Sequence, residues 1–176
     1  MESVTPARIL HLEDDSSDAA LIQFHLKAKK FDCILKWVST EADFKAALAQ
    51  GGHDLILSDY RMPGFDGDQA LQFVRTRYPH LPFIMLTGEL GEDRAIETLK
   101  RGATDYVLKG NLARLVPSIE RSLREARSQV ERSRGEQEVR DLKDPGSGPR
   151  RYAPDLRAGT GTAQSERFGV DAPPGA

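Results

Sequence analysis

The chain has 176 residues, and its 25 lysines and arginines are balanced by 27 aspartates and glutamates, which gives a formal net charge of −2. This balance argues against the basic surface of a nucleic-acid-binding protein, and the single cysteine, Cys33, excludes an internal disulfide. The sequence shows neither a signal peptide nor an apolar run long enough to cross a membrane, so we expect a soluble cytoplasmic protein with no nucleic acid or membrane among its partners.

Five apolar runs alternate with five helical patterns along the chain. The runs cover residues 8–13, 33–38, 54–58, 82–87 and 105–108, and the helical spacings cover residues 18–29, 41–50, 67–77, 92–101 and 112 onward. Short connections between such elements indicate βαβ crossovers, which build a parallel sheet with helices on both faces. The alternation therefore predicts a doubly wound α/β fold with a five-stranded parallel sheet.

The last helical pattern is longer than the others. Its apolar residues follow a 4-3-4-3-4 spacing and are Leu112, Val116, Ile119, Leu123, Ala126 and Val130. We expect a short turn first and the main helix from about Pro117, because proline suits the first helical position. The stripe leaves two interpretations open. It is either one helix that extends beyond the domain or a short two-chain coiled coil that joins a homodimer.

The composition divides the chain into three parts. We expect a globular domain at residues 7–124 and a helical extension at residues 125–143. Residues 144–176 contain 11 glycines and prolines among 33 residues, so they bury too little apolar surface to offset the entropy of ordering. We expect a disordered tail there, and no DNA-binding output domain after the last helix.

Polar residues end four of the five expected strands. Glu13 and Asp14 follow the first, Asp59 follows the third, Thr87 ends the fourth and Lys109 follows the fifth. Taken singly, each has an ordinary interpretation, such as a helix cap, a strand threonine or a solvated lysine. The carboxyl ends of parallel strands meet at one edge of the sheet, where open α/β sheets bind ligands. Carboxylates gathered there suit Mg²⁺, and a lysine beside them suits an anion.

The motifs around these residues resemble the CheY-like receiver domain of bacterial two-component response regulators. The resemblance covers residues 8–123. Its motifs are Leu12-Glu13-Asp14-Asp15, the run from Ser58-Asp59 to Asp66-Gly67, Met85-Leu86-Thr87-Gly88 and Asp105-Tyr106-Val107-Leu108-Lys109. It implies a flavodoxin-like sheet of order 2-1-3-4-5 with an extended fifth helix, in a receiver of the stand-alone type.

The resemblance implies a role for each acidic residue. Asp59 would accept a phosphoryl group from the phosphohistidine of a sensor histidine kinase or a histidine phosphotransfer protein. Mg²⁺ would be bound by Asp14, Asp59 and the main-chain carbonyl of Arg61, with Glu13 assisting mostly through water. Asp15 is expected to face solvent or to cap the first helix.

The resemblance also implies how the domain would signal. Lys109 would pair with one phosphoryl oxygen, and Thr87 would hydrogen-bond to another. Thr87 and Tyr106 would form the switch that changes the surface offered to a downstream protein target. Gly110 stands after Lys109 where many receivers have proline, so the loop there either keeps a costly cis bond or takes a different path.

Three other functions are compatible with parts of this pattern. A phosphatase or phosphotransferase of the haloacid dehalogenase type also uses an aspartyl nucleophile, but it needs a second aspartate where Arg61 stands. A flavodoxin-like flavin carrier needs a phosphate-binding loop after the first strand, where acidic residues would repel the phosphate. A module that binds partners without phosphotransfer is the third alternative. In the favoured interpretation the chain phosphorylates itself from a donor, has autodephosphorylation as a further activity, and is not a conventional enzyme.

Overall fold

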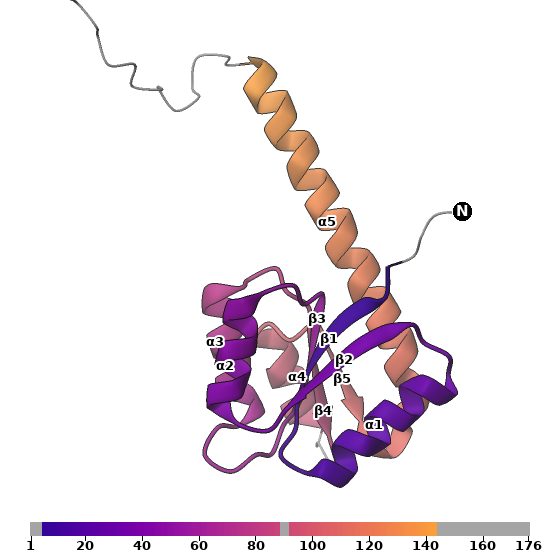
Figure 1. Ribbon diagram of the computed structural model, residues 1–176. Helices are drawn as coiled ribbons and strands as arrows, with labels where there is room; N and C mark the ends of the chain where they lie inside the picture. Colours follow the sequence, from indigo (N-terminus) through magenta and orange to yellow (C-terminus); the bar gives the residue numbers. More distant parts are fainter. Residues whose placement is uncertain (1–4, 89–91, 144–176) are drawn as a thin grey trace, which may run out of the picture.

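The computed structural model describes residues 5–88 and 92–143, and the expected disordered tail at residues 144–176 lies outside the described residues. At its centre is a five-stranded parallel sheet in the order β2-β1-β3-β4-β5 (Figure 1). The strands are β1 (Ala7–Leu12), β2 (Cys33–Val38), β3 (Leu55–Asp59), β4 (Phe83–Thr87) and β5 (Asp105–Leu108). The doubly wound sheet predicted from the alternation of elements and the strand order implied by the resemblance are both confirmed.

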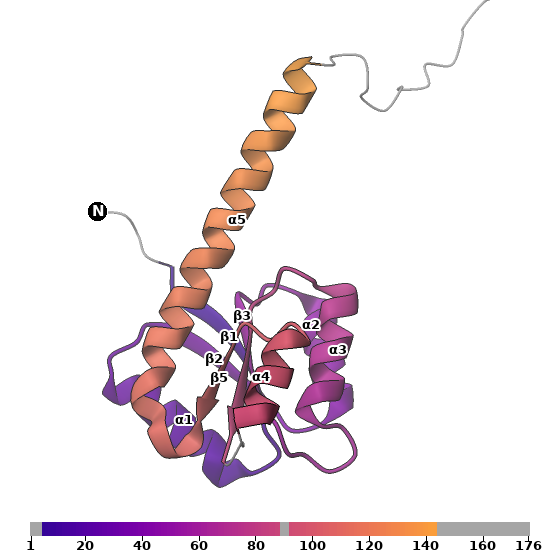
Figure 2. The same cartoon turned by 180° about the vertical axis from the view of Figure 1, so that it is seen from behind.

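Helices cover both faces of the sheet (Figures 1 and 2). They are α1 (Ser16–Ala28), α2 (Glu41–Gln50), α3 (Gly67–Arg77), α4 (Glu92–Lys100) and α5 (Leu115–Lys143), with the 3-10 helix η1 (Lys109–Arg114) before α5. Helices α1 and α5 pack with Leu57 on one face and α2 and α3 with Ile56 on the other, because successive strand residues point to opposite faces. All residues of β3 are buried, as expected of a central parallel strand.

Helix α5 begins at Leu115, two residues before the start that we predicted at Pro117. Pro117 is therefore the third helical residue, where its missing N–H is harmless because the first four N–H groups of a helix have no partner inside it. With 29 residues α5 is about 44 Å long, and its second half projects beyond the domain in Figure 1. Among the described residues, no helix has the length and apolar character needed to cross a membrane.

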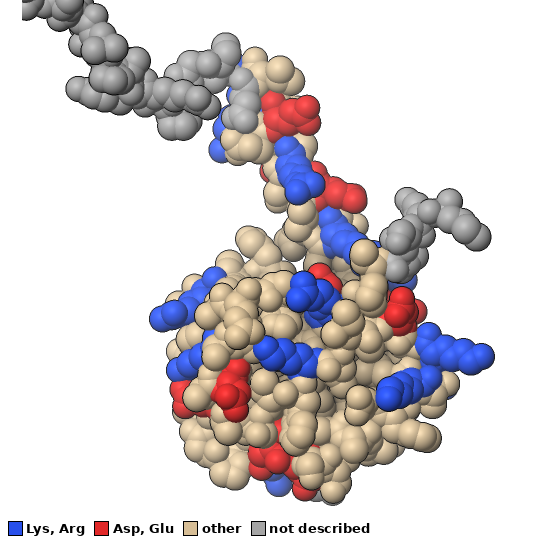
Figure 3. Space-filling view, viewed as in Figure 1, with Lys and Arg blue, Asp and Glu red and all other residues tan. Residues whose placement is uncertain are grey.

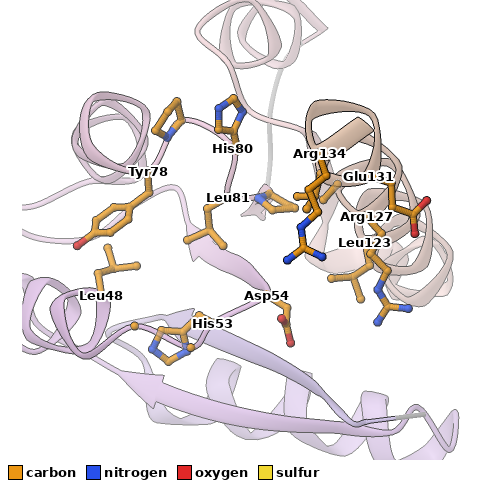
Figure 4. Close-up of a pocket in the computed structure, with 16 residues that line it drawn as sticks. Leu48, His53, Asp54, Tyr78, His80, Leu81, Leu123, Arg127, Glu131 and Arg134 are labelled. Carbon is orange, nitrogen blue, oxygen red and sulfur yellow. The ribbon is translucent and has the colours of Figure 1, made fainter. Parts of the chain in front are cut away.

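The projecting part of α5 forms one wall of a groove of about 570 Å³, at the end of the domain where β3 and β4 begin. In Figure 4, Leu123 and Arg134 of α5 lie across this groove from Leu48 and Leu81 of the domain. The groove lies at the opposite end of the strands from the polar residues that follow them. The homodimer through α5 stays a prediction.

Charged side chains are unevenly spread over the domain. Figure 3 shows acidic side chains gathered at the lower end of the molecule, with a basic side chain beside them. Along the projecting part of α5, basic and acidic side chains alternate. The acidic cluster among the described residues is Glu13, Asp14 and Asp59, which lies at the edge where β1 and β3 end.

Candidate functional site

The polar residues predicted from the strand ends meet at one edge of the sheet. Asp59 is the last residue of β3 and Thr87 the last of β4, and both are buried. Glu13 directly follows β1 and is also buried, while Lys109 directly follows β5. The Nζ atom of Lys109 lies 2.8 Å from Oδ1 of Asp59 and 2.7 Å from Oε2 of Glu13. Of the residues expected from the sequence, Glu13 and Asp59 therefore contact the Lys109 ammonium.

Three carboxylates at this edge are spaced for one cation. Glu13, Asp14 and Asp59 each offer an oxygen, and these atoms lie within 4.8 Å of one another. Hard oxygen donors of this kind, with room for waters, are the ligands that Mg²⁺ and Mn²⁺ take in proteins. Asp14 and Arg61 both line an adjoining cavity of about 480 Å³. The residues present therefore fit a divalent cation with an open side.

The main chain of the loop after β3 is fixed to the Asp59 carboxylate. The N–H of Arg61 donates a 3.1 Å hydrogen bond to Oδ2 of Asp59, so the two oxygens of this carboxylate have different partners. A Cβ at Gly67 would lie 2.5 Å from Sδ of Met85 and 2.7 Å from the carbonyl oxygen of Asp59. Only glycine lets α3 begin this close to the end of β3, so the loop stays compact around the carboxylate.

Burial and hydrogen bonding raise the pKa values of two groups in this site, for different reasons. Burial raises the pKa of Glu13 to about 7, although the hydrogen bonds from Lys109 and the Asp15 N–H act against it and the Asp59 charge adds to it. Burial alone would lower the pKa of Lys109, but its hydrogen bonds to Asp18, Asp59 and Glu13 outweigh burial and raise it above the ordinary value. Lys109 therefore stays charged, and in the metal-free site Glu13 titrates near neutrality.

Thr87 and Tyr106 lie on neighbouring strands. Thr87 pairs in register with Leu108 and Met85 pairs with Tyr106, so Tyr106 is one pleat away from Thr87 on the same face of the sheet. Tyr106 is half-buried and packs against the core between the sheet and helices α2 and α3. Thr87 and Tyr106 are thus neighbours on one face of the sheet, as two residues whose movements are coupled must be.

Asp18 belongs to this site, and the sequence interpretation missed it. It lies in the first turn of α1, and its Oδ2 atom lies 2.6 Å from Nζ of Lys109. In the sequence, Asp18 marks only the start of a helical pattern. The sequence feature that could have indicated this role is the position of Asp18 one turn after Asp15, the residue that caps α1 as expected. A helix that begins at this edge presents its first turn to the same site.

His11 and Trp37 also approach the site and were not expected there. His11 is fully buried in β1, and neither ring nitrogen has a hydrogen-bond partner in the part of the chain that the structure describes. Burial, then the Lys109 charge, lower the pKa of His11 to about 4. Trp37 of β2 donates from Nε1 to the main-chain oxygen of Glu13 at 2.7 Å. The second strand, from which no site residue was expected, thus contacts the loop that follows β1.

Known proteins share this sequence pattern and fold. A family model described as the response regulator receiver domain matches residues 9–120. Response regulator protein FleR of Pseudomonas aeruginosa is 37% identical over 111 residues, which cover 58% of this chain and 21% of FleR. Chemotaxis response regulator CheY4 of Vibrio cholerae matches with a TM-score of 0.59 and 25% identity over 67% of this chain and 99% of that one. The Mn(2+)-bound form of response regulator Rcp1 matches with a TM-score of 0.52 and 28% identity over 58% of this chain and 81% of that one.

The shared region is the domain that carries the site. The chain spans about a fifth of the length of FleR, so the similarity to FleR concerns one segment of that protein. The family model covers more than half of this chain and includes the residues that end β1, β3, β4 and β5. This chain belongs to the response regulator receiver domain family, the CheY-like signalling domain of two-component systems.

Proposed function

We propose that this receiver accepts a phosphoryl group on Asp59 from the phosphohistidine of a sensor histidine kinase or a histidine phosphotransfer protein. The observation that carries the proposal is the contact between the buried Asp59 carboxylate and Nζ of Lys109 at 2.8 Å. The same carboxylate lies within 4.8 Å of the ligand atoms of Glu13 and Asp14. A nucleophile, a counter-charge and a cation-binding set thus occupy one site.

The residues supply what phosphoryl transfer needs, which is mostly positioning and charge neutralisation. An oxygen of Asp59 attacks phosphorus, the P–N bond to the donor imidazole breaks, and the imidazole takes up a proton as it leaves. Lys109 pairs with one phosphoryl oxygen, and the Thr87 hydroxyl donates a hydrogen bond to another. The lysine contact with the nucleophile, and Arg61 two residues beyond it, support this chemistry over that of a haloacid dehalogenase.

Glu13, Asp14, Asp59 and the main-chain carbonyl of Arg61 are proposed to hold Mg²⁺. The oxygen-only donor set supports this choice, as does the Mn(2+)-bound form of Rcp1 among the similar structures. When bound, the ion supplies positive charge beside the phosphoryl oxygens. Glu13 and Asp14 would hold the ion beside the cavity that Asp14 and Arg61 line.

The signal is proposed to pass through protein contacts. Thr87 moves toward the phosphoryl group and Tyr106 moves inward behind it, which changes the surface formed by α4, β5 and α5. The partner is a downstream protein rather than DNA, which the balanced charge supports. Water then attacks the acyl phosphate, which returns the domain to its resting state. We place the protein in the cytoplasm, and this autodephosphorylation does not make the chain a conventional enzyme.

Acetyl phosphate with Mg²⁺ tests the proposal directly. We expect intact mass spectrometry to show one added phosphoryl group on the wild type and none on Asp59→Asn. Asp32→Asn is the matched control, because Asp32 is exposed and precedes β2 at the other end of the sheet. It should be modified like the wild type. An unmodified wild type, or an equally modified Asp59→Asn variant, contradicts the proposal.

A further inference from the structure

We propose that Asp18 is a positioning residue of the phosphoryl site, which holds the Lys109 ammonium so that one of its N–H groups points at Asp59 or at the phosphoryl group on it. The inference rests on the function proposed above. Its basis is the 2.6 Å contact between Oδ2 of Asp18 and Nζ of Lys109. Asp18 reaches the lysine from α1, an element that contributes no nucleophile and none of the clustered carboxylates.

The hydrogen-bond capacity of the lysine explains why this contact matters. An ammonium group has three N–H donors and no acceptor. Lys109 has three carboxylate partners, Asp18 at 2.6 Å, Glu13 at 2.7 Å and Asp59 at 2.8 Å. Asp18 and Glu13 thus fix the direction of two N–H groups of the ammonium. The third N–H group is left with one direction, toward Asp59.

Phosphorylation requires a change at only one of these three contacts. When Asp59 becomes an acyl phosphate, its carboxylate charge is lost and negative charge lies on the phosphoryl oxygens. The third N–H of Lys109 then turns from Oδ1 of Asp59 to a phosphoryl oxygen, while Asp18 and Glu13 keep theirs. The ammonium therefore needs little rearrangement, which is what a preorganised electrostatic site requires.

The main chain after Lys109 makes the Asp18 contact more important. Gly110 follows and has no side chain that could pack against a neighbour, and among the described residues nothing lies within 4 Å of a Cβ built there. Asp18 itself is well fixed, because the Asp15 side chain accepts hydrogen bonds from the N–H groups of Ser17 and Asp18. The side chain of Asp18 is 41% exposed, so its pair with Lys109 adds little to fold stability and acts mainly on the direction of the lysine.

Asp18→Asn tests the inference, since it removes the charge and keeps the shape. We expect phosphorylation by acetyl phosphate and Mg²⁺ to slow about tenfold, the factor that corresponds to loss of one charge-assisted hydrogen bond. Asp32→Asn is the matched control, because it removes an exposed carboxylate that precedes β2 at the other end of the sheet. Its rate should stay within about twofold of the wild type.

A double-mutant cycle separates positioning from a structural effect on α1. In a Lys109→Met background, Asp18→Asn should cause no further loss, because the group that it positions is gone. In nuclear magnetic resonance spectra, the Lys109 ammonium signal is protected in the metal-free wild type by hydrogen bonds to Glu13 and Asp18 and by the ion pair with Asp59. This signal should disappear in Asp18→Asn, while the backbone amide signals remain those of a folded protein.

Several outcomes overturn the inference. These are a wild-type rate in Asp18→Asn, an equal loss in the Lys109→Met background, or an unchanged ammonium signal. If the wild type takes up no phosphoryl group at all, the proposed function fails instead. The ammonium signal then decides alone whether Asp18 positions the lysine.

Discussion

The indole N–H of Trp37 donates a 2.7 Å hydrogen bond to the main-chain oxygen of Glu13. The bond ties the edge strand β2 to the loop that carries two of the clustered carboxylates, Glu13 and Asp14. Trp37 is the only tryptophan in the chain, and it is 47% exposed, so its emission is sensitive to movement of this loop. Trp37 is therefore an intrinsic fluorescence probe of the site.

We predict that Mg²⁺ changes the emission of Trp37 in a saturable way. Binding should shift the loop that carries Glu13 and alter the environment of the indole ring. Asp14→Asn should raise the Mg²⁺ concentration needed for half of the change by about tenfold or more, because it removes a charged ligand. Asp32→Asn should leave the curve unchanged. Calorimetric binding without any change in emission would contradict the prediction.

His11→Leu should stabilise the metal-free protein. The imidazole is fully buried without a hydrogen-bond partner among the described residues, which costs about 1–3 kcal/mol relative to a paired group. Leucine has a similar size and no polar atom, so we expect a gain of about 1–2 kcal/mol in the free energy of unfolding at pH 7. Urea denaturation in the presence of a chelator measures it, and a destabilised variant would count against this assignment.

The same substitution should change how stability depends on pH. Burial lowers the pKa of His11 from 6.5 to about 4, so between these values the unfolded chain binds a proton that the folded protein does not. The wild type therefore loses stability as pH falls from 6.5 toward 4, by up to about 3 kcal/mol from this residue. The difference between the variant and the wild type should grow over this window. A constant difference would show that His11 is not held neutral.

The positions of the strands and of the main site could be predicted because they follow local rules. A carboxylate that ends a buried apolar run, as Asp59 does, marks a strand end, and parallel strands bring such ends to one edge. Glu13, Thr87 and Lys109 were placed by this rule alone, and the structure gathers them there. The glycine that follows Lys109 does not change this result, because Lys109 still lies at the edge where the strands end.

Asp18 and His11 could not be placed because their environment depends on packing between elements. The side chain of Asp18 contacts Lys109 because α1 begins at the same edge of the sheet at which Lys109 follows β5, a relation that helical spacing does not contain. His11 lies in β1 among apolar neighbours, and the sequence pattern does not indicate which face of the strand carries its side chain. The start of α5 at Leu115 rather than Pro117 was missed because proline is tolerated throughout the first turn of a helix.

Gly67→Ala should destabilise the domain and slow phosphorylation. A Cβ at this residue would lie 2.5 Å from Sδ of Met85 and 2.7 Å from the carbonyl oxygen of Asp59, and the latter is backbone that does not move freely. We expect a cost of about 1–3 kcal/mol, typical of overpacking, together with displacement of the Asp59 carboxylate. Thermal unfolding and the acetyl phosphate assay measure the two effects.

Gly135→Ala is the matched control for this substitution. Gly135 lies inside α5, and among the described residues nothing lies within 4 Å of a Cβ built there. Alanine should favour the helix by about 0.5–1 kcal/mol and leave phosphorylation unchanged. If both variants behaved alike, the close approach at Gly67 would not be the reason for its glycine.

Asp105 should anchor α5 to the sheet. Its Oδ2 atom accepts hydrogen bonds from the hydroxyl of Ser118 and from Nη2 of Arg121, at 2.6 Å for the latter, and Asp105 itself is buried at the start of β5. Asp105→Ala leaves the buried Ser118 hydroxyl without this partner and should cost about 1.5–3 kcal/mol, the range for a hydrogen bond to a charged group. Arg121→Ala should cost less than about 1 kcal/mol, because the Arg121 side chain is 50% exposed.

Hydrogen exchange locates the effect of this substitution. If Asp105 holds the first turns of α5 against β5, amides of residues 115–123 should exchange faster in Asp105→Ala, while those of α2 on the opposite face keep their protection. Ser118→Ala combined with Asp105→Ala should cost less than the two single changes added together, because both remove the same bond. Additive costs, or faster exchange spread evenly over both faces, would mean that α5 is held by its apolar contacts alone. The α5 end of the proposed signalling surface would then move independently of β5.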